Sequence, residues 1–231
     1  MDDLTVIAVD WSGARSRAAQ RRGIWVAVVR DGTLVESRNG WTREQAVELV
    51  ANTPAPVYAG FDFSFGVPEW FALEHGCRTV DEVWALAARE GDRWLRTPMP
   101  PFWRYRCNVV PERRFRACEE QLRARGYAPK SIFQLVGNGQ VGAGSVRGMP
   151  LLRELRAAGF AIWPFDAPGE RTVLEVYPST LGAKGTDRED AERAARTMWH
   201  DRTEIARLAP AIGAVERLEG DVWLPAAFRD T

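Results

Sequence analysis

The stretch LTVIAVDW, residues 4–11, decides the fold class of this chain. It is an almost unbroken run of apolar and β-branched residues, which is typical of a strand buried on both faces of a sheet. Asp10 stands near its end, although a carboxylate among apolar neighbours costs free energy unless it is paired or binds a cation. The run therefore predicts a buried strand that carries an acidic side chain to the edge of a sheet.

The segments that follow predict more of the same sheet. Residues 24–32 and 33–40 read as two strands joined by a hairpin at Asp31-Gly32. Residues 42–52 have apolar positions at helical spacing, with Thr42 as the N-cap. Residues 55–68 read as another buried strand. This β-β-β-α-β order predicts an α/β domain with a mixed sheet flanked by helices.

The later part of the chain predicts an insertion followed by a return to the core. Residues 69–150 combine helices, a Pro/aromatic segment, an arginine-rich helix and a glycine-rich loop, and we interpret them as a helical and loop insertion after the fourth strand. Beyond it we expect a helix beginning at Pro150, two strands and a long amphipathic helix over 188–210. The length of 231 residues fits one domain over 1–231.

Composition excludes several classes of function. The 31 basic and 31 acidic residues cancel, so no overall field attracts the protein to nucleic acid or to a membrane, and any nucleic-acid contact needs a local patch. The three cysteines are widely spaced, without a C-x-x-C pair, which argues against a disulfide framework or a zinc knuckle. The N-terminal apolar run is too short for a signal peptide, and no run approaches the roughly 18 apolar residues of a membrane span. We expect a cytoplasmic protein; the sequence leaves its oligomeric state open.

Three carboxylates stand where acids are rare. Asp10, Asp62 and Glu175 each lie among β-branched or aromatic residues near the end of a predicted strand. Ligands bind at that edge of open α/β sheets, and hard divalent cations relieve the repulsion between converging carboxylates. We therefore expect these three residues to be the catalytic set and the ligands of one or two Mg²⁺ or Mn²⁺ ions, which activate water against a phosphodiester. The alternative is structural: two acids order turns and Glu175 pairs with an arginine.

The glycine-rich segment matches G-x-G-x-x-G through Gly137, Gly139 and Gly142. A dinucleotide-binding unit needs its helix to begin at the third glycine. Further glycines and Pro150 predict that the helix starts only at Pro150. We therefore interpret the segment as a flexible loop, with Gly137 and Gly139 as candidates to approach a substrate phosphate through their main chain.

Arginines alternate with aromatic residues over 101–126, a pattern that suits single-stranded nucleic acid because rings stack on bases and arginines hold phosphates. Arg113 and Arg116 are candidate phosphate contacts. Lys130, one of only two lysines, is a further candidate at the head of the glycine-rich segment. The alternative is an amphipathic helix whose arginines pair with neighbouring glutamates, and an exposed Lys130.

Several motifs, taken together, resemble the ribonuclease H-like fold, and more closely the DUF429 family of predicted RNase H-like nucleases. The motifs are AVDWSGA (8–14), GFDFSFGVP (60–68), RRFRACE (113–119), PKSIFQLVGNGQVGAGSVRGMPLLREL (129–155), WPFD (163–166) and LEVYPS (174–179). The resemblance covers most of the chain, and the long central motif is its most specific part. It implies a metal-dependent nuclease site with Asp10, Asp62 and Glu175 as ligands.

One departure from the pattern bears on the site. In RNase H-like nucleases a final helix usually supplies another acid. In this chain such a helix would begin at AAFRDT (226–231), which are the last residues of the sequence. Asp201, Asp221 and Asp230 are candidates for that acid. Two other interpretations remain open: a binding protein that retains the site without the chemistry, and an ATP-dependent phosphotransferase of the actin and sugar-kinase type, for whose second domain the chain is short.

Overall fold

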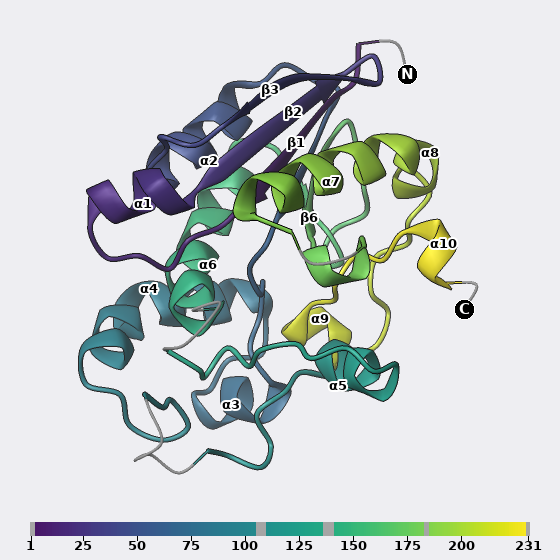
Figure 1. Cartoon of the computed structure of the whole chain (residues 1–231). Helices are drawn as coiled ribbons and strands as arrows, with labels where there is room; N and C mark the ends of the chain where they lie inside the picture. Colours follow the sequence, from purple (N-terminus) through teal and green to yellow (C-terminus); the bar gives the residue numbers. More distant parts are fainter. Residues whose placement is uncertain (1–2, 105–109, 136–140, 183–184, 230–231) are drawn as a thin grey trace.

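A computed structural model describes residues 3–104, 110–135, 141–182 and 185–229. Its centre is a six-stranded mixed sheet with the strand order β3-β2-β1-β4-β6-β5 (Figure 1). Strand β2 runs antiparallel to its neighbours β1 and β3, whereas β4, β6 and β5 are parallel to β1 and to each other. The α/β class with a mixed sheet flanked by helices is therefore confirmed.

The strands lie close to their expected places. The first four in the chain are β1 (Thr5–Asp10), β2 (Trp25–Arg30), β3 (Thr33–Arg38) and β4 (Val57–Phe61). The last two, β5 (Ala161–Ile162) and β6 (Arg171–Glu175), add to the edge beside β4. Because β1, β4 and β6 are parallel neighbours, the ends of these three strands meet at one edge of the sheet, as the sequence analysis assumed.

The longer helices divide between the two faces of the sheet. On one face lie α2 (Arg43–Asn52), α4 (Val80–Arg96) and α6 (Val141–Ala157), and α6 contacts both of the others. On the other face α7 (Asp187–His200) lies across β1 to β4 (Figure 1). The shorter helices are α1 (Arg17–Gly23), α3 (Glu69–Glu74), α5 (Ala117–Ala124), α8 (Arg202–Ile205), α9 (Glu216–Glu219) and α10 (Ala226–Arg229).

Alternation along the strands separates two hydrophobic cores. Ile7 and Val9 of β1 belong to the large core beneath α2, α4 and α6, whereas Val6 and Ala8 belong to the smaller core beneath α7. Gly60 of β4 faces α7 so closely that an added Cβ would lie 2.6 Å from the sulfur of Met198. The same alternation decides to which side each acid at the strand ends points.

The helix after the glycine-rich segment begins earlier than predicted. It runs from Val141, not from Pro150, which lies inside it. Its glycines allow close packing: a Cβ on Gly142 would lie 2.2 Å from the carbonyl oxygen of Ile132, and one on Gly148 would lie 2.6 Å from the ring of Phe63. The helix tolerates these glycines because their closeness to neighbouring segments outweighs their low helix propensity.

Two further expectations change in detail. The arginine-rich helix begins at Ala117, so Arg113 to Arg116 precede it, and the long C-terminal helix is broken between α7 and α8. The range predicted as an insertion, 69–150, contains α3, α4, α5 and their connections, and its predicted end at residue 150 falls inside α6. Within the ranges described, no helix has the length and apolar character needed to cross a membrane.

Candidate functional site

Asp10 and Asp62 lie together at the carboxyl edge of the sheet. Asp10 ends β1, and Asp62 follows β4 directly, with its main-chain N–H bonded to the Val9 carbonyl at 3.1 Å. By alternation both side chains point to the α7 face, Asp10 in phase with Ala8 and Asp62 in phase with Tyr58. Among the residues described, neither carboxylate accepts a hydrogen bond or joins a salt bridge.

The first turn of α7 brings two more acids to this pair. Thr186 caps the helix with its side chain, and Asp187 and Asp190 occupy the first turn. An N-terminal turn favours acidic residues, since its free N–H groups and the helix dipole attract negative charge. Asp190 also binds Arg193, with 3.1 Å between Oδ1 and Nη1, whereas Asp187 is exposed to solvent.

The negative charges of the α7 acids act on Asp10 and Asp62. Burial, together with the negative charges of Asp62, Asp187 and Asp190, raises the pKa of Asp10 to about 9. Burial, together with Asp190, Glu175 and Asp187, raises the pKa of Asp62 to about 7. Proximity of like charges and loss of water both favour the neutral carboxyl. We call Asp10, Asp62, Asp187 and Asp190 the acidic cluster.

Glu175 takes a different place from the one predicted. It pairs in register with Phe61 and, like Val173, faces the large core, so it points away from the α7 side of the sheet. Its carboxylate binds both Nη atoms of Arg116, Oε2 lying 2.9 Å from Nη1, and it accepts the Phe65 N–H at 2.8 Å. Burial raises the pKa of Glu175, and the ion pair with Arg116 opposes that rise. The structural alternative, pairing with an arginine, describes this residue.

Arg116 is correspondingly not at the surface. It is 1% exposed, and its Nε also binds Glu119 Oε1 at 2.9 Å while its Nη1 donates to the Glu219 carbonyl at 3.1 Å. One guanidinium thus connects β6, the insertion and the C-terminal segment. The prediction that Arg116 contacts substrate phosphate does not fit this position, because its donors are turned toward protein acceptors.

The remaining predicted substrate contacts are scattered or undescribed. Arg113 is exposed, 5.9 Å from the Trp70 ring centre, and Lys130 is exposed as well. Gly137 and Gly139 lie outside the residues that the structure describes. Of the two candidate arginines in this segment, Arg113 is exposed and Arg116 is buried. The role of the segment as a nucleic-acid contact stays a prediction.

The reason given for rejecting a dinucleotide site needs correction. The helix does begin beside the third glycine of the motif, since α6 starts at Val141. What the motif lacks is its strand: in the described residues before it, Gln134 makes only an isolated bridge with Trp103, away from the main sheet. Gly142 itself packs against the 132–134 main chain.

The sequence analysis missed the two acids of α7 and named others instead. Asp201 is 7% exposed and accepts the Ala226 N–H at 2.7 Å, and Asp221 accepts the N–H of the next residue. Asp230 lies outside the described residues. A usable signal was the sequence TDRED at 186–190, an N-cap followed by acids at the start of an amphipathic helix.

The acidic cluster has the right donor atoms for a divalent cation, but its carboxylates are not yet arranged around one position. All four donors are carboxylate oxygens, which Mg²⁺ and Mn²⁺ prefer. Within the described ranges, however, no three His, Cys, Asp or Glu side chains are already arranged as a metal site. Asp10 and Asp62 are the pair that would hold an ion, and the acids of α7 are the nearest to complete its ligands.

Comparison with known proteins adds no further constraint. No protein-family model, curated protein or solved structure matches this chain. The resemblance to the DUF429 family therefore stays a prediction.

Proposed function

We propose that this protein is an RNase H-like, divalent-metal-dependent phosphodiester hydrolase of the DUF429 type. The observation that carries the proposal is that two carboxylates, Asp10 and Asp62, lie at the ends of neighbouring parallel strands without a salt-bridge partner in the described residues. Half-buried acids without a cation are costly, so their retention side by side favours a role in binding one. The order β-β-β-α-β, with β4 beside β1, also agrees with the fold that the resemblance implies.

In this proposal the protein supplies position and charge. Asp10 and Asp62 would hold the cation from the rigid ends of β1 and β4, and Asp187 and Asp190 would complete the negative field from α7. A bound divalent cation supplies activation of a water molecule and stabilisation of the leaving oxygen. The Arg116–Glu175 pair acts as a positioning element, because it fixes the loop after Asp62 through the N–H of Phe65.

A thermal-shift titration with Mg²⁺ and Mn²⁺ tests the cation site. We expect metal to raise the melting temperature of the wild type by several degrees, since a ligand that binds only the folded state stabilises it. The Asp10→Asn/Asp62→Asn variant should start higher without metal and should not respond to it. Asp31→Asn, in the exposed hairpin turn, is the matched control and should respond like the wild type.

Cleavage of labelled single-stranded and duplex DNA and RNA then tests the reaction. We expect metal-dependent cleavage of at least one substrate, lost in Asp10→Asn and retained in Asp31→Asn. A wild type whose melting temperature no metal changes would refute the metal-dependent hydrolase. Metal binding without cleavage would favour the non-catalytic binding domain, and stabilisation that depends on ATP would favour the phosphotransferase.

A further inference from the structure

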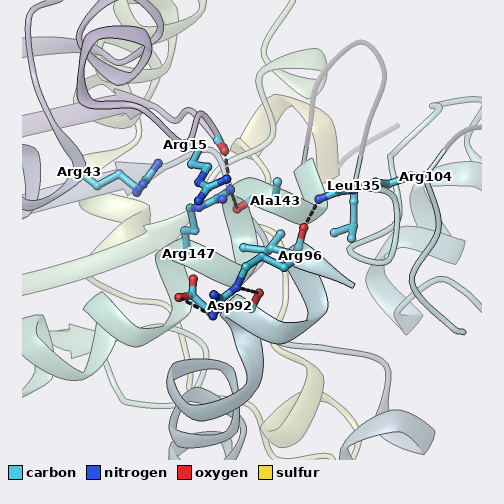
Figure 2. Close-up of a pocket in the computed structure, with 10 residues that line it drawn as sticks. Arg15, Arg43, Asp92, Arg96, Arg104, Leu135, Ala143 and Arg147 are labelled. Atoms are coloured by element: carbon cyan, nitrogen blue, oxygen red, sulfur yellow. Dashed lines mark hydrogen bonds and ion pairs between the residues drawn. The ribbon is translucent and has the colours of Figure 1, made fainter. Parts of the chain in front are cut away.

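A strongly basic pocket lies on the side of the sheet opposite α7. It has a volume of about 570 Å³, and five of its ten lining residues are arginines, with Asp92 as the single acid. Figure 2 shows Arg15, Arg43 and Arg147 next to one another, with Arg96 and Asp92 on the α4 side. The full lining is Gly13, Arg15, Arg43, Asp92, Leu95, Arg96, Arg104, Leu135, Ala143 and Arg147.

Acidic side chains are scarce in the lining of this pocket. Asp92 pairs with Arg96, at 3.5 Å between Oδ2 and Nη2, which leaves a net charge of about +4 on the lining. The side-chain hydrogen bonds of Arg43 and Arg147 within the described residues run from Nη1 to main-chain carbonyls only. Five arginines around one cavity repel each other, so an anion in the cavity would relieve a cost that the protein now carries.

The arginines are held in place before any ligand binds. Arg43 is 7% exposed and donates to the carbonyls of Ser12, at 3.0 Å, and Ala14, at 2.8 Å. Arg147 donates to the Gly13 carbonyl at 2.6 Å. Both side chains thus hydrogen-bond to the loop that carries Arg15. In the described part of the chain, their Nε and Nη2 groups donate no hydrogen bond. Donors fixed in this way lose little conformational entropy when a ligand binds.

The electrostatics agree with an uncompensated site. Burial, and then the nearby charge of Arg147, lowers the pKa of Arg43 to about 10. Burial also lowers the pKa of Arg147, which Asp92 partly opposes and the charges of Arg15 and Arg104 reinforce. Ala143 lies in the first turn of α6, whose N-terminal end adds positive potential.

We propose that this pocket binds a small, multiply charged phosphate compound of the pyrophosphate or nucleoside diphosphate class. Planar guanidinium groups match phosphate oxygens in pairs, and several arginines match more than one phosphate group. The volume suits a small molecule, since small-molecule sites usually measure about 300–1,000 Å³. The proposal does not depend on the acidic cluster, because the pocket lies on the other side of the sheet and contains neither Asp10 nor Asp62.

Calorimetric titration with inorganic pyrophosphate in EDTA, at physiological salt, tests the proposal. We expect saturable binding to the wild type, at least tenfold weaker binding in Arg147→Ala and several-fold weaker binding in Arg15→Ala. Arg15 is the safer variant, because no hydrogen bond of its side chain is found in the described residues. Arg153→Ala, which removes an exposed arginine of α6 outside the pocket, is the matched control and should bind within twofold of the wild type.

Two further arms separate this site from other sources of binding. Asp10→Asn/Asp62→Asn should bind pyrophosphate unchanged, even if it loses metal binding and cleavage. A labelled single-stranded oligonucleotide is tested alongside pyrophosphate. Oligonucleotide binding that is lost in Arg15→Ala, in a protein that does not bind pyrophosphate, would overturn the proposal in favour of a nucleic-acid backbone site. Absence of pyrophosphate binding to the folded wild type, or equal weakening in Arg15→Ala and Arg153→Ala, would also overturn it.

Discussion

Two groups of acids lie at the same edge of the sheet, one buried and one half-buried, and they have opposite environments. On one side, Glu175 shares the guanidinium of Arg116 with Glu119 and is enclosed by protein donors. On the other, Asp10 and Asp62 face the acids of α7 without a paired cation in the described structure. The difference teaches that the ends of parallel strands gather acids, while the partners on each face decide whether an acid is structural or available.

The largest loss of stability is expected when the buried ion pairs of Arg116 with Glu175 and Glu119 are broken. Arg116→Met leaves Glu175 and Glu119 buried without their cation, which should cost roughly 3–5 kcal/mol of unfolding free energy. For a chain of this size that corresponds to a fall in melting temperature of about 10 °C. Chemical denaturation and thermal melting measure both quantities.

Arg113→Met is the control for that change. Arg113 is exposed and only three residues away, so its replacement should alter the free energy of unfolding by less than about 0.5 kcal/mol. If the two variants were equally stable, the buried ion pair would not organise this side of the sheet.

The stability contributed by Asp10 and Asp62 should change with pH in the opposite sense to that of a salt-bridged acid. The pKa values of Asp10 and Asp62 are about 9 and about 7 in the folded protein, both above the unfolded value. Their protonated forms are therefore favoured by folding, and the resulting stability is fully present near pH 4 and is lost as pH rises toward 9. In EDTA, we expect Asp10→Asn to be more stable than the wild type at pH 8.

The size of that difference identifies its cause. It should reach about 2 kcal/mol or more at pH 8 and shrink steadily toward pH 5, since each pH unit contributes at most about 1.4 kcal/mol per group. Melting at several pH values measures it, with Asp31→Asn as the control that should show a constant offset. An Asp10→Asn difference that did not change with pH would mean that Asp10 is ionised at little cost.

The smallest effect is expected for Arg193, which offsets part of the negative charge of the acidic cluster. Arg193 binds Asp190, and both are partly exposed, so Arg193→Ala should cost only about 0.5–1 kcal/mol at pH 8 without metal. Arg207→Ala removes another i,i+3 pair, with Glu204 of α8, which is not one of the acids of the cluster. We expect denaturation to show a pH-dependent loss for Arg193→Ala and a pH-independent one for Arg207→Ala; the same pH profile in both would mean that Arg193 does not offset the charge of the acidic cluster.

Local signals predicted much of the fold. The apolar runs at β1, β2 and β4 and the capped helix at Thr42 appear where the sequence indicated them, because strand and helix patterns follow from short-range periodicity. The start of α6 could not be predicted in this way. Its glycines oppose a helix locally. They become necessary only because the folded chain brings the Ile132 carbonyl against Gly142 and the Phe63 ring, from a distant part of the sequence, against Gly148.

By itself, the sequence determined that acids end the neighbouring strands β1, β4 and β6, since each interrupts an apolar run. The tertiary structure decided which of them meet. A strand turns successive side chains to opposite faces, so one residue of register sends Glu175 to Arg116 while Asp10 and Asp62 face α7. It also decided that Asp187 and Asp190 join them, and that arginines from five separate segments line one pocket, because such contacts depend on how distant parts of the chain pack together.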